Sequence, residues 1–195
     1  MTLQRIAADS VAPQPWRNGG GQTRELLTWP SPTEWSVRVS LADIAADGPF
    51  SCFPGVQRCF AVVHGAGVRL DFAGTQIPIT VRSAPLCFDG AQAPGCSLLA
   101  GPTRDLNLMC RDGTCSMRRV EPEVAWTQGF AIRGLFCAVA GRWTDGQQCC
   151  QLQADTLLWT TDANAAGWSF VPAATSPDGG TAAWWLGFTP AGART

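Results

Sequence analysis

The sequence predicts an all-β protein. Short runs of apolar, β-branched and aromatic residues recur along the 195-residue chain, and Gly, Pro, Asp or Asn interrupts them about every ten residues. Helical periodicity is scarce. A mildly helical stretch, residues 41–48, runs into Gly48 and Pro49 and is too short for more than a turn or two. Together these features predict a β-sandwich or a β-barrel.

The clearest strand is expected at residues 35–42, WSVRVSLA. Its apolar residues alternate with polar or small ones, as in a strand with one buried and one polar face. Arg38 and Ser40 therefore share the polar face. Further strands are expected at residues 58–65, 67–72, 77–82, 86–88, 96–101, 105–111, 116–120, 133–141, 150–159 and 182–188.

The second half of the chain echoes the first. The segment FAVVHGAG, from Phe60, is similar to FCAVAGRW, from Phe136, and the strand at 105–111 has a similar late counterpart at 182–188. The separations within the two pairs are nearly equal. Two β-units in tandem would produce this spacing, and chance similarity between β-strands is the alternative.

Composition argues against several functional classes. The chain is 46% hydrophobic and 15% charged, a balance that can bury a sizeable core, and its formal net charge is −1. Because the charge is small and the arginines are scattered, we expect no binding to nucleic acid or to an anionic membrane. The N-terminus lacks the apolar run of a secretory signal, and no window approaches the ~20 apolar residues of a spanning helix. We therefore expect a cytoplasmic protein.

Several residue types are missing. All 14 basic residues are arginine, so lysine Schiff-base chemistry and the usual lysine-bearing phosphate loop are both excluded. Tyrosine is absent and His64 is the only histidine, so a metal site built on several histidines is excluded. We expect no metal and no cofactor. The nine cysteines form no C-x-x-C pair, and we expect most of them to be reduced and buried.

Three consecutive glycines, Gly19 to Gly21, lie inside the stretch PWRNGGGQTREL. Glycine permits backbone with positive φ and lets a ligand or another chain come close. We expect the stretch to turn sharply at the rim of a pocket, with Trp16 and Asn18 on one side and Thr23 and Glu25 on the other. A plain flexible bend is the alternative.

Several blocks resemble one protein family. The segments PWRNGGGQTREL, WSVRVSLADIAADGPFSCFPGVQR and GPTRDLNLM follow one another as in the HutD/Ves family, a group of small bacterial proteins. The resemblance covers residues 15–109, and beyond them it rests on the general β pattern and on DTLLW. It implies a double-stranded β-helix, or cupin, fold with two cupin units. We place these units at residues 1–115 and 116–195, and we expect strand exchange between them.

The same resemblance implies a role in binding or regulation. Members of the family are associated with histidine-utilisation operons or with stress responses, and have no established catalytic activity. The resemblance suggests a pathway intermediate such as urocanate or formylglutamate as the effector. The cysteine and tryptophan richness and the divergent C-terminal half of this chain depart from the family pattern.

Arginine and amide side chains provide the expected ligand site. Buried guanidinium groups need an anionic partner and suit a carboxylate bidentately, so we expect Arg58 and Arg38 to hold a small carboxylate. Pairing of each arginine with an internal acid such as Asp105 or Glu25, or a position on the surface, is the alternative. The full set of expected ligand-binding residues is Asn18, Arg38, Ser51, Phe53, Gln57, Arg58, Asp105 and Asn107.

Two lines of reasoning place these residues together. Asp105 and Asn107 alternate with leucines and so face the same way, either into the barrel or toward water. Ser51, Phe53 and Gln57 lie on loops next to Arg58, and loops on rigid scaffolds often carry binding groups. Core packing is the alternative for Phe53.

Other residues are assigned weaker roles. His64 ends an apolar strand beside a turn, where we expect a hydrogen-bonded or exposed side chain. Inert burial is favoured over reactivity for Cys52 and Cys59. The tryptophans at positions 35, 159, 184 and 185 are expected to pack the core or a homodimer interface.

A metal-independent isomerase, lyase or hydrolase is the rival to a binding protein. It would use Asp105, Glu25 or His64 as the proton-transfer group. A dimerising interaction protein, in which the barrel is only a scaffold, is the third interpretation.

Overall fold

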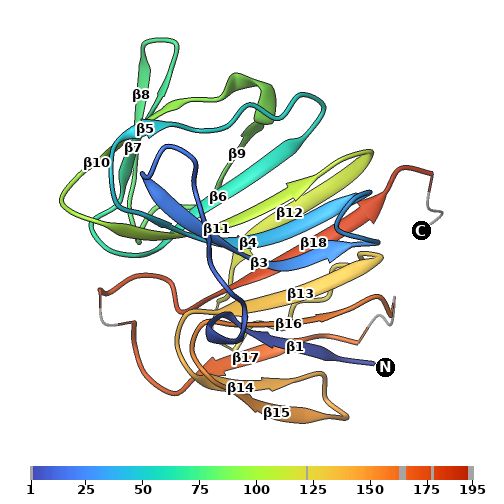
Figure 1. Ribbon diagram of the computed structural model, residues 1–195. Coiled ribbons are helices and arrows are strands. Elements are labelled where there is room, and N and C mark those ends of the chain that lie inside the picture. Colours follow the sequence, from blue (N-terminus) through green and yellow to red (C-terminus); the bar gives the residue numbers. More distant parts are fainter. Residues whose placement is uncertain (1, 122, 163–165, 177, 193–195) are drawn as a thin grey trace.

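The protein is built almost entirely of β-strands. A computed structural model describes residues 2–121, 123–162, 166–176 and 178–192, in which strands β1 to β18 are joined by turns and by the short 3₁₀ helices η1 (Ala8–Ser10) and η2 (Gly90–Gln92). Figure 1 shows the first half of the chain above the second half. The all-β class predicted from the sequence is confirmed.

Two sheets make up most of the first half. The larger is six-stranded, with the antiparallel order β2 (Gln14–Pro15), β3 (Gly21–Trp29), β4 (Val37–Ile44), β11 (Thr103–Cys110), β6 (Gln57–His64) and β9 (Leu86–Asp89). The smaller is four-stranded, with the order β5 (Gly48–Pro49), β10 (Gly95–Leu98), β7 (Val68–Phe72) and β8 (Thr75–Ile79). We call these two sheets the N-terminal pair.

Two further sheets make up the C-terminal pair. One is five-stranded, with the order β1 (Gln4–Ala7), β16 (Thr156–Thr160), β13 (Ile132–Cys137), β18 (Ala183–Pro190) and β12 (Gly113–Arg119). The other has the order β15 (Cys149–Leu152), β14 (Gly141–Thr144) and β17 (Ser169–Pro172). Strand β1 begins the chain yet pairs with β16, so the N-terminus is hydrogen-bonded into the C-terminal pair (Figure 1).

Three apolar clusters hold the sheets together. One joins the six-stranded sheet to the five-stranded sheet and includes Leu41, Leu106 and Phe136. A second lies within the N-terminal pair, around Phe60 and Leu70. The third lies within the C-terminal pair and contains the tryptophans Trp126, Trp143, Trp168 and Trp185. Because side chains alternate along a strand, the six-stranded sheet sends one face to each of the first two clusters.

The tryptophans expected in a core or an interface are largely internal. Trp184 and Trp185 are adjacent on β18 and enter different clusters, since consecutive side chains point to opposite faces. Trp159 belongs to the cluster between the two large sheets. Trp35 is only partly buried, and the guanidinium of Arg111 lies 4.2 Å above its ring.

Some strand boundaries differ from those predicted. The strand expected at residues 150–159 is two strands, β15 and β16, because a turn containing Asp155 in a left-handed conformation (φ 51°) separates them. Strands β1, β14 and β17 were not predicted, because these segments are short and lack a clear period of two.

One expectation about the cysteines needs correction. Cys59 on β6 and Cys87 on β9 are directly opposite in the sheet and form a disulfide. The expectation of inert, reduced burial therefore fails for Cys59. The remaining cysteines, Cys52, Cys96, Cys110, Cys115, Cys137, Cys149 and Cys150, are free thiols. Cys52 is exposed, so the expectation of burial is wrong for this residue too.

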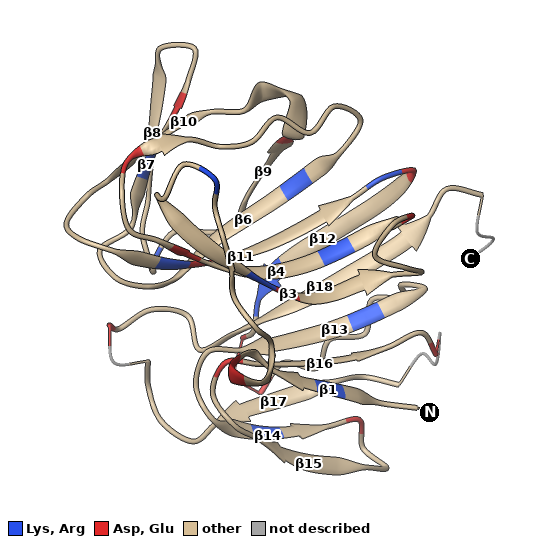
Figure 2. Cartoon of the chain, viewed as in Figure 1, with Lys and Arg blue, Asp and Glu red and all other residues tan. Residues whose placement is uncertain are grey.

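Charge is sparse across the strands. Figure 2 shows acidic and basic residues scattered over both halves, with most of each strand uncharged. In the part of the chain that the structure describes, no helix has the length and apolar character needed to cross a membrane.

Candidate functional site

A cavity of about 430 Å³ opens on the face of the six-stranded sheet that belongs to the N-terminal pair. We call it the N-terminal cavity. Strands β3, β4, β6 and β11 form its floor, and the glycine loop before β3 and the loop after β5 form its walls. Its lining is Gln14, Pro15, Trp16, Arg17, Asn18, Thr23, Arg38, Ser40, Ala42, Pro49, Phe50, Ser51, Phe53, Arg58, Asn107 and Met109.

Most residues predicted from the sequence meet at this cavity. Alternation on adjacent strands places Arg38, Arg58 and Asn107 on the same sheet face, and the loops add three more. The predicted residues found in the lining are Asn18, Arg38, Ser51, Phe53, Arg58 and Asn107. Gln57 and Asp105 are not part of the lining.

Gln57 does not lie beside the other predicted residues, so the prediction of its position is wrong. Gln57 precedes Arg58 on β6, so its side chain points to the opposite face of the sheet. There its Oε1 accepts hydrogen bonds from the thiols of Cys110 and Cys115, at 3.8 and 3.3 Å. Proximity in sequence to Arg58 was the reason for including Gln57, and strand alternation removes it from the cavity.

Arg58 is the most buried charged group of the lining. Its Nε and Nη2 donate hydrogen bonds to Oδ1 of Asn107, at 2.9 and 2.6 Å. Its guanidinium carbon lies 4.0 Å from the centre of the Phe50 ring, within the range of a cation–π contact. No acidic residue among those described forms an ion pair with Arg58.

Burial makes the charge on Arg58 costly. The side chain is 9% exposed, and desolvation is the main cause that lowers its pKa to about 10, with nearby Arg38 adding to the effect. The field of Asp105 acts in the opposite direction but does not cancel the shift. A guanidinium that is hydrogen-bonded to a neutral amide is positioned without being neutralised, and an anion in the cavity would supply the missing charge.

Arg38 has an internal partner. Its Nη2 lies 2.7 Å from Oε1 of Glu25 on β3, the neighbouring strand. This is the internal ion pair that the sequence left open as an alternative, and it applies to Arg38 and not to Arg58. Arg38 therefore brings less net charge to the cavity than Arg58 does.

The glycine loop forms one wall of the cavity. Gly19 has φ 71°, and the amide of Gly20 donates to Oδ1 of Asn18 at 3.1 Å, so the loop has a defined turn. The indole Nε1 of Trp16 donates to Oγ1 of Thr23 at 2.8 Å and fixes the ring across the turn. A side chain at Gly21 would collide with the carbonyl of Asp43 and press on the Trp16 ring, so the third glycine is required by close packing.

Asp105 faces the same side of the six-stranded sheet as Asn107, outside the cavity lining, and is fully buried. Its Oδ2 accepts a hydrogen bond from Oγ1 of Thr103 at 2.6 Å, while Oδ1 has no partner among the described residues. Burial raises the pKa of this carboxyl to about 7, although Thr103 and Arg58 both act to lower it. Asp105 does face the interior, as its alternation with Leu106 predicts, but it acts on Arg58 only through space.

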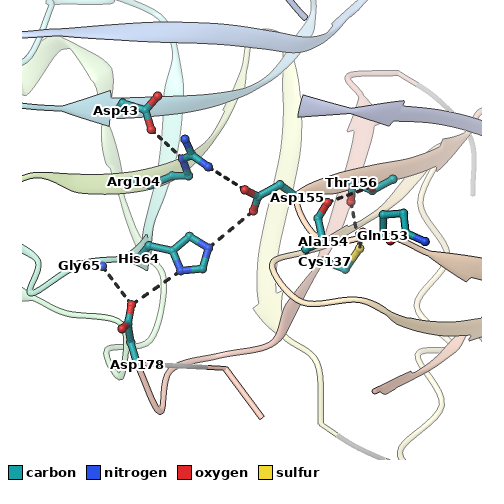
Figure 3. A network of polar contacts seen from close by, with 10 residues as sticks. All are labelled: Asp43, His64, Gly65, Arg104, Cys137, Gln153, Ala154, Asp155, Thr156 and Asp178. Atoms are coloured by element: carbon teal, nitrogen blue, oxygen red, sulfur yellow. Dashed lines mark hydrogen bonds and ion pairs between the residues drawn. The ribbon is translucent and has the colours of Figure 1, made fainter. Parts of the chain in front are cut away.

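His64 is remote from the cavity lining. Figure 3 shows it at a junction between the two halves, where its ring lies between the carboxylates of Asp155 and Asp178. Both nitrogen-to-oxygen distances are 3.7 Å. Hydrogen bonding to Asp155 is the main cause that raises the pKa of His64, against the opposing effect of burial. The expected strand-end histidine is thus part of an ionic network.

Arg104 completes this network. Its Nε contacts Oδ1 of Asp43 at 2.6 Å and its Nη1 contacts Oδ2 of Asp155 at 2.7 Å, as Figure 3 shows. Asp43 and Arg104 belong to the six-stranded sheet, and Asp155 precedes β16. The network therefore links the N-terminal pair to the C-terminal pair.

Sequence reasoning missed a second buried arginine. Arg133 is the second residue of β13, which is buried along its whole length, and is 1% exposed. Its guanidinium carbon lies 4.7 Å from the ring centres of both Trp126 and Trp168, and its Nη1 and Nη2 donate to the carbonyls of Ala166 and Trp126 at 2.8 Å each. The sequence contained one signal for this residue. Arg133 shortly precedes FCAVAG, as Arg58 shortly precedes the similar segment FAVVHG.

The interior of the C-terminal pair is filled where the N-terminal pair is hollow. Trp126 stacks on Trp185 at 5.2 Å between ring centres, and Trp143 meets Trp168 edge to face at 5.1 Å. These rings enclose Arg133 with aromatic surface and carbonyl oxygens. The described residues contain no group of three or more His, Cys, Asp or Glu side chains arranged to hold a metal ion.

Comparison with known proteins places this chain in a family. The HutD family model matches residues 8–175. Protein Ves of Citrobacter koseri is 32% identical over 135 residues, which cover 68% of this chain and 71% of that protein.

Solved structures of similar proteins have the same fold. The conserved protein of unknown function PA5104 from Pseudomonas aeruginosa PAO1 is 26% identical, with a TM-score of 0.83 over 97% of this chain and 100% of that one. HutD from Pseudomonas fluorescens SBW25 is 24% identical, with a TM-score of 0.81 over 98% of this chain and 100% of that one. More distant solved structures share the same cupin-like all-β fold. The chain belongs to the HutD family.

Proposed function

We propose that this protein binds a small carboxylate in the N-terminal cavity and acts as a regulator of histidine utilisation. The observation that carries the proposal is the charge of the lining. The described lining contains Arg17, Arg38 and Arg58 and no Asp or Glu. Glu25, which is outside the lining, partly neutralises the charge of Arg38. Arg58, in contrast, contacts a neutral amide and aromatic rings.

The lining of the cavity can also hold the apolar part of a small acid. Trp16, Phe50, Phe53 and Met109 supply apolar surface, and such surface carries most of the affinity for a small ligand. Hydroxyl and amide groups lie beside it, among them Ser51. These groups suit the remaining polar atoms of an acid whose carboxylate faces Arg58.

The link to histidine utilisation comes from the family. Members resemble one another in the signature blocks described above, and a similar solved structure is a HutD protein from Pseudomonas fluorescens SBW25. We propose urocanate or formylglutamate as the effector on this ground. Each carries at least one carboxylate, as the cavity requires.

We also propose that the two sheet pairs are two cupin units. The three apolar clusters support this division, because one lies inside each pair and the third lies between them. Strand β1 would then be exchanged into the second unit. The boundary near residue 115 falls where β11 of one pair is followed by β12 of the other.

Binding is favoured over catalysis by the positions of the acid–base groups. His64 lies in the junction network, and Asp105 is buried outside the lining with its Oδ2 hydrogen-bonded to Thr103. Glu25 is engaged with Arg38. A general acid or base must reach the reacting atom, and none of these three side chains is part of the lining.

Calorimetric titration tests the proposal. Urocanate and formylglutamate are titrated into the wild-type protein and into Arg58→Ala, with Arg142→Ala as the matched control because Arg142 is an exposed arginine on β14. We expect binding by wild type and by Arg142→Ala, and at least a tenfold loss for Arg58→Ala, about 1.4 kcal/mol. Absence of binding by both acids in the wild-type protein would overturn the proposal.

A further inference from the structure

Two thiols share one hydrogen-bond acceptor at the crossing between the two large sheets. Cys110 ends β11 in the six-stranded sheet, and Cys115 lies on β12 in the five-stranded sheet. Both sulfur atoms donate to Oε1 of Gln57, at 3.8 and 3.3 Å. The side chains therefore converge on one point although their strands belong to different sheets.

The pair differs from the other cysteines in both contact and access. Cys59 and Cys87 are already joined in a disulfide. Cys110 is 1% exposed, whereas Cys115 is only partly buried, so solvent reaches the pair from one side. A small reagent can meet the partly exposed sulfur while the buried one stays in contact with it.

We propose that Cys110 and Cys115 form a redox-modification site that closes into a reversible disulfide on reaction with a small-molecule disulfide such as oxidised glutathione. One cysteine loses its proton and attacks the reagent, whose sulfur–sulfur bond breaks and releases one thiol. The second cysteine loses its proton and attacks the protein sulfur of the mixed disulfide, releasing a second thiol. The two protein thiols are oxidised and the reagent is reduced to two thiols.

The short connection between the two cysteines favours the reaction at this pair. Only residues 111–114 separate them, and Asp112, between β11 and β12, has φ 48°, as in a tight turn. The second sulfur is thus held beside the first before either reacts.

Closure would change the surroundings of Gln57. Both of its thiol donors would be lost to the new bond, and Gln57 directly precedes Arg58 on β6. Closure would also tie β11 to β12, and so one large sheet to the other. Because the closed loop is very short, we expect only a small change in the stability of the whole chain.

Peptide mapping tests the proposal on the full chain. The reduced protein is treated with oxidised glutathione in native buffer, remaining thiols are alkylated, and the protein is digested with trypsin. Cleavage after Arg111 separates the two cysteines, so a disulfide between peptides 105–111 and 112–118 is diagnostic. We expect this linked species to be the main new product, and reductant to reverse it.

Controls separate the folded geometry from mere proximity in sequence. Cys115→Ser should abolish the linked species, whereas Cys52→Ser, at an exposed thiol elsewhere, should retain it. Equal yield from urea-unfolded protein would overturn the proposal, because the fold would then contribute nothing. A glutathione adduct that persists on Cys115 beside a free Cys110 would overturn it as well.

Discussion

Oδ1 of Asn107 accepts two hydrogen bonds from Arg58, from Nε at 2.9 Å and from Nη2 at 2.6 Å. The amide and the guanidinium come from neighbouring strands, β11 and β6, so the sheet itself sets their geometry. An amide orients the guanidinium but leaves its charge uncompensated. This relationship is the physical basis of the proposed anion site.

Replacing the amide by a carboxylate should therefore block the site. We expect Asn107→Asp to lower the affinity for urocanate or formylglutamate by at least tenfold, about 1.4 kcal/mol, because the new carboxylate competes for Arg58. Asn107→Ala removes the orienting group without adding charge and should lose less. Calorimetry measures both, and equal losses in the two variants would contradict the electrostatic explanation.

Each chain should bind one carboxylate. Arg133, the buried arginine of the second half, already donates to the carbonyls of Ala166 and Trp126 and is enclosed by tryptophans. Among the described residues, these carbonyl oxygens and two tryptophan rings already surround the guanidinium. Calorimetry should give a stoichiometry of about one. A second site that survives Arg58→Ala would show that this comparison of the two halves is wrong.

His64 should make the junction between the halves more stable in acid. Hydrogen bonding to Asp155 is the main cause that raises its pKa, with Asp178 adding to it and Arg104 opposing it. The raised pKa means that this stabilisation is complete below the unfolded value, near 6.5, and is lost as pH rises through the higher folded value.

Urea unfolding of wild type and Asp178→Asn measures the effect. Asp178 contacts the His64 ring and the amide of Gly65, so its replacement should reduce the stabilisation without touching Arg104. We expect wild type to exceed the variant by at most about 1 kcal/mol at pH 5.5, since the groups are partly exposed, and by less at pH 8.5. A constant difference across this range would contradict the prediction.

Asp105 should also make the chain less stable as pH rises, here between acid and neutral pH. Burial raises the pKa of its carboxyl to about 7 from an ordinary value of 3.8. Between these values the unfolded chain releases the proton while the folded chain keeps it, so stability falls as pH rises through that window and then levels off.

Asp105→Asn removes this titration. Relative to wild type, the variant should become progressively more stable from about pH 4 to about pH 7, as measured by urea unfolding. Thr103→Val is the informative companion, because Oγ1 of Thr103 donates to Oδ2 of Asp105 and favours the ionised form. Loss of this hydrogen bond should raise the pKa of Asp105 further, so that stability keeps falling to a higher pH. Identical pH profiles for wild type and Asp105→Asn would refute the assignment of this titration to Asp105.

The third glycine of the loop should tolerate replacement less well than the second. A Cβ at Gly21 would collide with the backbone carbonyl of Asp43 and meet the Trp16 ring at 3.1 Å, whereas a Cβ at Gly20 would find its nearest neighbour, Oδ1 of Asn18, at 3.4 Å. We expect Gly21→Ala to lower the free energy of unfolding by about 1–3 kcal/mol. Thermal and urea unfolding of both variants should show a much smaller loss for Gly20→Ala.

The local pattern of the chain was sufficient for the class of fold and for much of the site. Alternation on residues 35–42 and 105–111 put Arg38 and Ser40 on one face, and Asp105 and Asn107 on one face, because side-chain direction in a strand depends on position. The same rule, applied strictly, would have excluded Gln57. The signature blocks identified the family, and the glycine run marked the cavity wall.

Only the tertiary structure decided which side chains pair across different strands. The ion pair of Arg38 with Glu25, the amide partner of Arg58 and the disulfide of Cys59 all depend on which strands are neighbours in the six-stranded sheet. The hollow first half and the tryptophan-filled second half likewise arise from packing between sheets, around residues such as Arg133. Side-chain direction is a local property of a strand, whereas charge compensation and cavity volume depend on contacts between residues far apart in the chain.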